Sequence, residues 1–281
     1  MTRQTFPMDS SFADLEIDGR SQRLEYAWVG SERGDSPVIV FLHEGLGSLA
    51  MWKDFPQTLC AAAGARGLVF SRYGYGRSTP RPPAEKWPVE FMHVQAERVL
   101  PALFARLELN VPLWLFGHSD GGSIALLYAA AFPDCVAGLV MVAPHVFVED
   151  VSVASIEQAR VAYAARDLRQ RLARYHDDPD SAFGGWNDIW LDPAFRAWNI
   201  EDCLSRIRCP LLAVQGEDDE YGTMAQIDAV ARRVSHARLL KMPDCGHSPH
   251  RDQPAALTKA VVAFLREQWP APARSAKAVQ A

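Results

Sequence analysis

The chain has 281 residues, of which 48% are hydrophobic and 22% are charged, values close to those of an ordinary globular protein. This length accommodates one large domain with an insertion or two small domains, and we expect the former. The formal net charge of −5 argues against a nucleic-acid-binding protein, because such proteins usually carry a basic surplus.

The sequence contains no targeting or membrane-spanning pattern. Its N-terminal segment lacks the apolar run of an export signal, and no stretch of about 18 apolar residues suggests a membrane span. We therefore expect no membrane contact, and the unpaired cysteines favour a cytoplasmic protein without a bound metal; no cofactor is expected, and the sequence gives no indication of oligomeric state. The five cysteines form no CxxC pair and have no histidine at metal-ligand spacing; they lie at positions 60, 135, 203, 209 and 245.

Short apolar segments alternate with longer segments of helical spacing, which is typical of a mostly parallel sheet with helices on both faces. The pattern first predicts an antiparallel edge hairpin at 12–17 and 24–29. Buried strands are then expected at 37–42, 67–70, 112–116, 137–142, 211–215 and 238–242. Helices are expected at 51–63, 89–107, 121–132, 224–234 and 254–267.

The alternation of strands and helices stops in the segment 144–208, which is rich in Arg, Asp and Trp and has helical spacing. This segment is too long for a loop without structure of its own, so we predict an inserted helical cap there. The cap would divide the core into a first part, 1–143, and a second part, 209–269. The Ala/Pro/Lys-rich residues 270–281 are predicted to be a disordered tail.

The segment from Gly117 to Gly121 indicates a catalytic nucleophile. It reads Gly-His-Ser-Asp-Gly, follows a predicted strand and precedes a predicted helix. This is the context of the nucleophile elbow G-x-S-x-G, in which glycines permit a sharp turn that exposes the serine at a helix N-terminus. The pattern predicts Ser119 as the nucleophile.

A serine nucleophile needs a base, and the base needs a carboxylate partner that holds its tautomer. In this architecture the acid and then the histidine follow the serine, each after a later strand. Asp219 and His247 occupy such positions. Asp218 and His250 are the alternatives; we favour Asp219 as the acid and His247 as the base.

These segments together resemble the three triad segments of the α/β-hydrolase family, and the resemblance covers about residues 24–269. In that family the carboxylate of a Gly-x-x-Asp turn is the acid and the His directly after a Gly is the base. The resemblance therefore supports Asp219 and His247, and it implies an α/β-hydrolase fold and hydrolytic activity. The neighbouring Glu217 and Glu220 are interpreted as solvated loop charges.

An oxyanion hole needs two backbone N–H donors. We expect one from Asp120 and the other from Gly45, whose loop, 43–48, resembles the His-Gly-x-x-Gly loop of the family. Glu44 departs from that pattern, because the family usually has Gly there. The Glu44 carboxylate would either tether the loop, which we favour, or bind a cationic substrate group.

The side chain of Asp120 offers a similar choice. The run Ser-Asp-Gly-Gly resembles one in valacyclovir hydrolase and similar α-amino-ester hydrolases, where the acid helps to hold the substrate's amino group. We favour the simpler interpretation that Asp120 interacts favourably with the dipole of the helix that it begins.

The substrate is expected to be a small molecule with an ester-like acyl group. Aromatic residues of the cap, including Trp186 and Trp190, together with His145 and Phe147, would line its pocket or form the core of the cap. Carboxylic esters, lactones, thioesters, α-amino esters and the carbon–carbon bonds of ring-cleavage products all remain possible substrates. A different class of function, a non-catalytic or slow ligand receptor on the same fold, also remains open.

Overall fold

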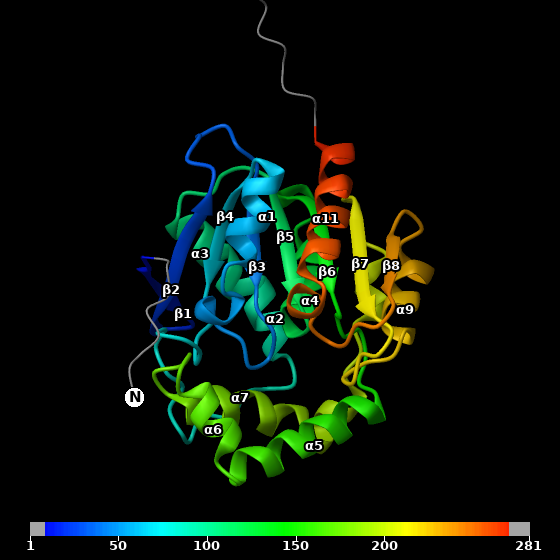
Figure 1. Cartoon of the computed structure of the whole chain (residues 1–281). Coiled ribbons are helices and arrows are strands. Elements are labelled where there is room, and N and C mark those ends of the chain that lie inside the picture. Colours follow the sequence, from blue (N-terminus) through cyan, green and yellow to red (C-terminus); the bar gives the residue numbers. More distant parts are fainter. Residues whose placement is uncertain (1–8, 270–281) are drawn as a thin grey trace, which may run out of the picture.

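The computed structural model describes residues 9–269, which form one eight-stranded sheet with helices on both faces (Figure 1). The strand order is β1-β2-β4-β3-β5-β6-β7-β8; β1 and β2 are antiparallel to their neighbours, and the other strands are parallel. The strands are β1 (Ser11–Ile17), β2 (Arg20–Gly30), β3 (Val38–Leu42), β4 (Arg66–Phe70), β5 (Leu113–His118), β6 (Val136–Val142), β7 (Leu211–Gly216) and β8 (Arg238–Met242). The predicted α/β-hydrolase fold class is confirmed.

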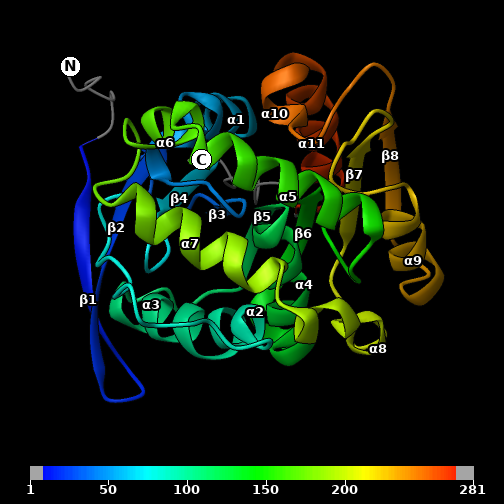
Figure 2. The same cartoon turned by 90° about the horizontal axis from the view of Figure 1, so that it is seen from below.

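The central strands β3, β5, β6 and β7 are almost entirely buried because both of their faces are covered. In β3, Val40 and Leu42 pack into one hydrophobic cluster and Ile39 and Phe41 into the other, as the twofold periodicity of a strand requires. Helices α1 (Phe55–Ala63) and α11 (Pro254–Gln268) cover one face; α2 (Phe91–Val94), α3 (Leu100–Arg106), α4 (Asp120–Ala131) and α9 (Ala225–Arg233) cover the other. Figure 2 shows α1 and α11 on the opposite side of the sheet from α2, α3 and α4.

The helix predicted at 89–107 is interrupted by a wider turn. Between α2 and α3 the chain forms a π-helical turn, Gln95–Val99. Pro101 follows at the second position of α3. Proline lacks an N–H and clashes with the preceding turn, which accounts for the change of helical type at this place.

The segment between β6 and β7 is helical and lies beyond the carboxyl ends of the parallel strands (Figure 1). Its side chains, among them Ile156, Leu172 and Trp186, belong to the same hydrophobic cluster as β3 and α4. We keep the name cap segment for residues 144–208. It contains α5 (Asp150–Ala164), α6 (Asp167–Leu172), α7 (Pro179–Trp190), the 3-10 helix Pro193–Ala197 and α8 (Glu201–Leu204).

Residues 270–281, for which a tail was predicted, lie outside the described part of the chain. Among the helices of residues 9–269, none is sufficiently long and apolar to cross a membrane.

Candidate active site

Ser119 occupies a sharp turn between β5 and α4. Its φ of 53° and ψ of −120° fall where non-glycine residues are rarely found, and such strain is typical of functional sites. The turn requires glycine on either side, since a Cβ at Gly117 would lie 2.3 Å from the carbonyl oxygen of Gly121. A Cβ at Gly121 would lie 2.0 Å from that of Leu42. The close packing therefore fixes the strained serine at the N-terminus of α4.

Asp219 and His247 come together from the loops that follow β7 and β8. Nδ1 of His247 donates to Oδ1 of Asp219 over 2.8 Å. The backbone N–H of Tyr221 donates to the same oxygen over 2.8 Å, and Nε2 of Gln215 donates to Oδ2 over 3.2 Å. The Asp219 carboxylate is therefore fixed by several donors, and it in turn fixes the tautomer and orientation of the imidazole.

Burial and ion pairing act in opposite directions on this pair. Burial raises the pKa of Asp219, but the hydrogen bond and charge of His247 outweigh it and hold that pKa below its ordinary value. For His247 burial favours the neutral ring, whereas Asp219 favours the charged ring; the pKa of His247 is raised overall. His250, the alternative base, is buried against Trp52, with the ring centroids 4.9 Å apart, and is not joined to Asp219.

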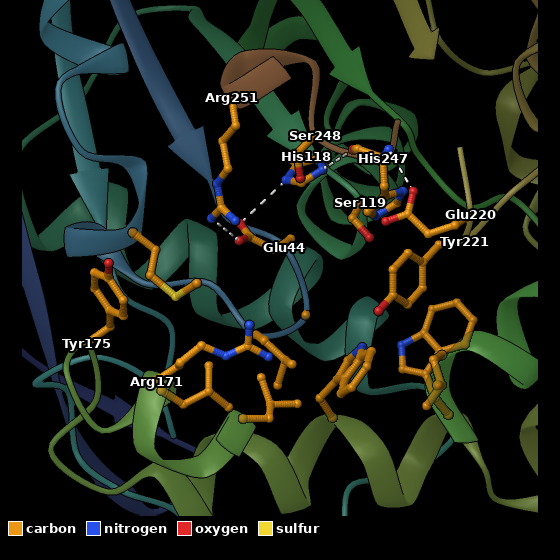
Figure 3. Close-up of a pocket in the computed structure, with 18 of the residues that line it drawn as sticks. Glu44, His118, Ser119, Arg171, Tyr175, Glu220, Tyr221, His247, Ser248 and Arg251 are labelled. Carbon is orange, nitrogen blue, oxygen red and sulfur yellow. Dashed lines mark hydrogen bonds and ion pairs between the residues drawn. The ribbon is translucent and has the colours of Figure 1, made fainter. Parts of the chain in front are cut away.

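Ser119 and His247 line the same cavity, which has a volume of about 540 Å³ (Figure 3). His145, Trp186, Trp190, Glu44 and Gly45, all expected near the substrate, line it too. The cavity therefore unites residues from the loops after β3, β5, β6, β7 and β8 and from the cap segment. Among residues 9–269, no group of His, Cys, Asp and Glu side chains could hold a metal ion.

The loop after β3 is held rigidly beside Ser119. The carbonyl oxygen of Glu44 accepts hydrogen bonds from the N–H of Gly47, over 3.0 Å, and from Nη2 of Arg72, over 2.9 Å. Trp186 packs directly on Gly45, because a Cβ there would lie 2.2 Å from the indole. Within residues 9–269 no acceptor is found for the N–H of Gly45, and the N–H of Asp120, as the first of α4, has none inside its helix.

The two acidic side chains nearest Ser119 in the sequence motifs, Glu44 and Asp120, both contact other side chains of the protein. Oε1 of Glu44 accepts from Nη2 of Arg251 over 3.0 Å, and Oε2 lies 3.4 Å from Nδ1 of His118. Burial opposes the charge of Glu44, yet His118 and Arg251 hold its pKa well below the ordinary value. Asp120 is fully buried; Oδ1 accepts from Nε1 of Trp190 over 3.1 Å, and Oδ2 lies 3.6 Å from Nη2 of Arg72.

Comparison with known proteins decides the family. The sequence profile described as "Alpha/beta hydrolase family" matches residues 39–260. The chain belongs to the alpha/beta hydrolase family.

Relatives of this alpha/beta hydrolase include several esterases and hydrolases. "Serine hydrolase BPHL" from Homo sapiens is 28% identical over 189 residues, which cover 63% of this chain and 61% of that protein, so the match spans about three fifths of the relative. "Bifunctional esterase/perhydrolase DCH" from Acinetobacter calcoaceticus is 26% identical, over 83% of this chain and 92% of the relative. The solved enol-lactonase from Burkholderia xenovorans LB400 shares the fold, with a TM-score of 0.70 and 23% identity over 90% of this chain and 99% of that chain.

The structure places one residue that was expected in the pocket of this alpha/beta hydrolase outside it. Phe147 does not line the cavity that contains Ser119. It forms an isolated β-bridge with Asn199, and its carbonyl oxygen accepts from Nε2 of Gln226 over 3.1 Å. The chain has already turned toward the cap segment at this point, so proximity in sequence to His145 does not bring Phe147 to the site.

Several lining residues of this alpha/beta hydrolase were missed or given another role. Glu220 is exposed, as expected, but its Oε2 also accepts from the backbone N–H of His247 over 3.1 Å. The ring of Tyr221 lies 4.8 Å from that of His247. Arg171 and Arg251 line the cavity from α6 and from α10 (Pro249–Asp252), and nothing in their local sequence distinguishes them from solvated surface charges.

Proposed function

We propose that this chain is a serine hydrolase that cleaves a small ester-like acyl substrate, a carboxylic ester, lactone or thioester, through an acyl-enzyme on Ser119. The observation that carries the proposal is the 2.8 Å hydrogen bond between Asp219 and His247 in the cavity that Ser119 also lines. The strained backbone of Ser119 supports it, because nothing in the packing of a simple turn requires a serine in this conformation.

In the proposed reaction the Ser119 hydroxyl oxygen attacks the substrate's carbonyl carbon, and Nε2 of His247 takes the hydroxyl proton. Nδ1 already donates to Asp219, so Nε2 is the nitrogen left to act as base. The carbonyl oxygen becomes an anion that would accept from the N–H groups of Gly45 and Asp120. The ester bond then breaks, and the leaving alkoxide or thiolate receives the proton from His247.

The second half of the reaction releases the acyl group. Water attacks the acyl carbon bound to Ser119, and His247 takes one of its protons. The acyl–oxygen bond breaks, the proton passes from His247 to Ser119, and the free acid leaves. No other reactant is needed, so the side chains of the cavity suffice for the complete cycle.

The cavity is largely apolar away from these groups. Its apolar lining consists of Leu46, Met51, Ile156, Leu168, Leu172, Trp186 and Trp190. Five of these belong to α5, α6 and α7: Ile156, Leu168, Leu172, Trp186 and Trp190. We therefore propose that the cap segment covers the site and selects an acyl substrate with an apolar portion.

The test is labelling with a fluorophosphonate, followed by mass spectrometry of the adduct and turnover of a panel of p-nitrophenyl esters, lactones and thioesters. We expect an adduct on Ser119 and an activity that falls by at least about 10³-fold in Ser119→Ala. Ser205→Ala, at an exposed position away from the cavity, is the control. Labelling at the nearby Ser248 instead would refute the nucleophile. Labelling without turnover of any ester would favour the ligand receptor.

A further inference from the structure

The acids beside Ser119 do not offer a free negative charge to a substrate. Glu44 faces both Arg251 and His118, and the Asp120 carboxylate is enclosed between Arg72 and Trp190. Asp120 is fully buried and does not line the cavity. A substrate ammonium group would have to displace Arg251 from Glu44 or Arg72 from Asp120, so the arrangement disfavours the recognition of an α-amino ester.

Two cationic side chains that line the cavity have no hydrogen-bond partner or counter-ion in the part of the chain that the structure describes. Arg171 and Lys53 both line it, and within residues 9–269 neither side chain forms a hydrogen bond or an ion pair. Together with Arg251 they give the lining three cationic side chains against two carboxylates, although the chain as a whole carries a net charge of −5. The cavity lining therefore carries more cationic side chains than carboxylates, in contrast to the chain as a whole.

The side chains of Arg171 and Arg251 enter the cavity from opposite sides. Figure 3 shows the Arg171 side chain extending from α6 toward the Glu44–Arg251 pair, across the cavity from α10. Glu44 already binds Arg251 over 3.0 Å, which leaves Arg171 without a carboxylate of its own. Two guanidinium groups that face a common space attract an anion, and each presents several N–H donors in the geometry that carboxylate and phosphate match.

The backbone of Lys53 has an unusual conformation. Its φ of 54° and ψ of −130° are close to those of Ser119 and are rarely adopted by residues other than glycine. Glycine would adopt this conformation without strain, so the lysine side chain is retained at an energetic cost. A binding role for its charge accounts for that cost.

We propose that the substrate carries an anionic group, a carboxylate or a phosphate, that binds Arg171 and Lys53 at the end of the cavity away from Asp219 and His247. The apolar side chains of Leu46, Ile156 and Leu172 would contact the portion between that anion and the scissile carbonyl. This inference rests on the proposed hydrolase activity. It assigns the substrate a charge opposite to that of an amino ester.

The experiment compares p-nitrophenyl esters that share one chain length and differ in their terminal group. The acyl chains end in a methyl group, a carboxylate, a phosphate or an ammonium, and kcat/KM is measured for each. We expect the carboxylate or phosphate ester to exceed the neutral ester by roughly three- to tenfold at low salt, an advantage that shrinks as ionic strength rises. The ammonium ester should be the poorest substrate.

Variants then assign the effect. Arg171→Gln should remove most of the advantage of the anionic ester, measured as the ratio of kcat/KM for the anionic ester to kcat/KM for the neutral ester. Arg174→Gln, an exposed arginine three residues further along that does not line the cavity, is the matched control and should keep the advantage. The combination of Arg171→Gln with Lys53→Gln should equalise the anionic and neutral esters.

The outcomes separate the two levels of the proposal. Turnover of the neutral ester with no advantage for either anion, or an advantage untouched by Arg171→Gln, would overturn the anionic substrate and leave the hydrolase activity standing. Preference for the ammonium ester would overturn it in favour of an amino-ester hydrolase. If no ester were turned over and Ser119 took no label, the hydrolase function itself would fail, and this inference with it. Preference between carboxylate and phosphate identifies the anion.

Discussion

Glu44→Gln tests the interactions that join the loop after β3 to the backbone of His247, the proposed base. The substitution keeps the size of the side chain and removes the charge that faces Arg251 and His118. Nε2 of His118 donates to the carbonyl oxygen of His247 over 2.7 Å, so the network of Glu44 reaches the backbone of the base. We expect the variant to lose both stability and activity on neutral esters.

The magnitude follows from the exposure of the two partners. The Arg251 side chain is 38% exposed, so its ion pair is screened and contributes less than about 1 kcal/mol. The His118 side chain is fully buried, but its contact with Oε2 of Glu44 is long, at 3.4 Å, so we assign it about 1 kcal/mol. We therefore expect a total loss of about 1–2 kcal/mol, with a fall in Tm of roughly 2–4 °C for each kcal/mol.

The loss should depend on pH with a definite sign. The folded pKa of Glu44 lies well below its ordinary value of 4.5, so its carboxylate contributes stability above pH 4.5 that disappears as the pH falls through the folded pKa. The stabilities of wild type and Glu44→Gln should therefore converge in acid.

The assay is urea unfolding of both proteins over a series of pH values from neutral to acid. Glu157→Gln, at an exposed position on α5, is the control and should unfold like the wild type. Equal stability of Glu44→Gln and wild type near neutral pH would refute the tethering role. A selective loss of activity toward amino esters, with stability unchanged, would instead support the cationic-substrate interpretation.

Three further predictions concern other parts of the site. Asp219→Asn should lower kcat by about 10³- to 10⁴-fold. Because Asp219 raises the pKa of His247, the variant should also move the rising limb of the pH profile of kcat/KM to lower pH, and an unshifted profile would contradict the pairing. Gly45→Ala should cost about 1–3 kcal/mol by overlap with Trp186 and be partly rescued by Trp186→Leu, as urea unfolding of single and double variants would show. Lys53→Gly should raise Tm, since it relieves a strain of about 1–3 kcal/mol, while it weakens turnover of anionic esters; a lower Tm would argue against the strain.

The sequence predicts the fold and the pairing of Asp219 with His247 because their signals are local. Each lies near a glycine on a loop that follows a predicted strand, in the order acid then histidine after Ser119, and a 2.8 Å hydrogen bond joins the two side chains. Arg171 and Arg251 carry no such signal. Each is an arginine on a short helix, and only the packing of the cap segment over the sheet brings them to one cavity.

The sequence also does not show the direction in which a side chain points. His145 and Phe147 are two residues apart, yet the first lines the cavity and the second pairs with Asn199. Likewise the acid next to the nucleophile points into the protein, where Trp190 of the cap segment donates to it. Its position beside Ser119 in the sequence therefore does not predict which partners the Asp120 carboxylate contacts.

Glu44 stands where the family usually has glycine, and its contacts suggest why a carboxylate is tolerated beside an oxyanion. Its negative charge would oppose a second anion at Ser119, but Arg251 and His118 face it from the other side. Its carbonyl oxygen is held by Arg72, so the peptide that presents the N–H of Gly45 is fixed before substrate binds. Preorganised donors stabilise a developing oxyanion most when nothing must move during the reaction. The Glu44 side chain thus adds contacts with Arg251 and His118 to a loop whose backbone Arg72 already holds.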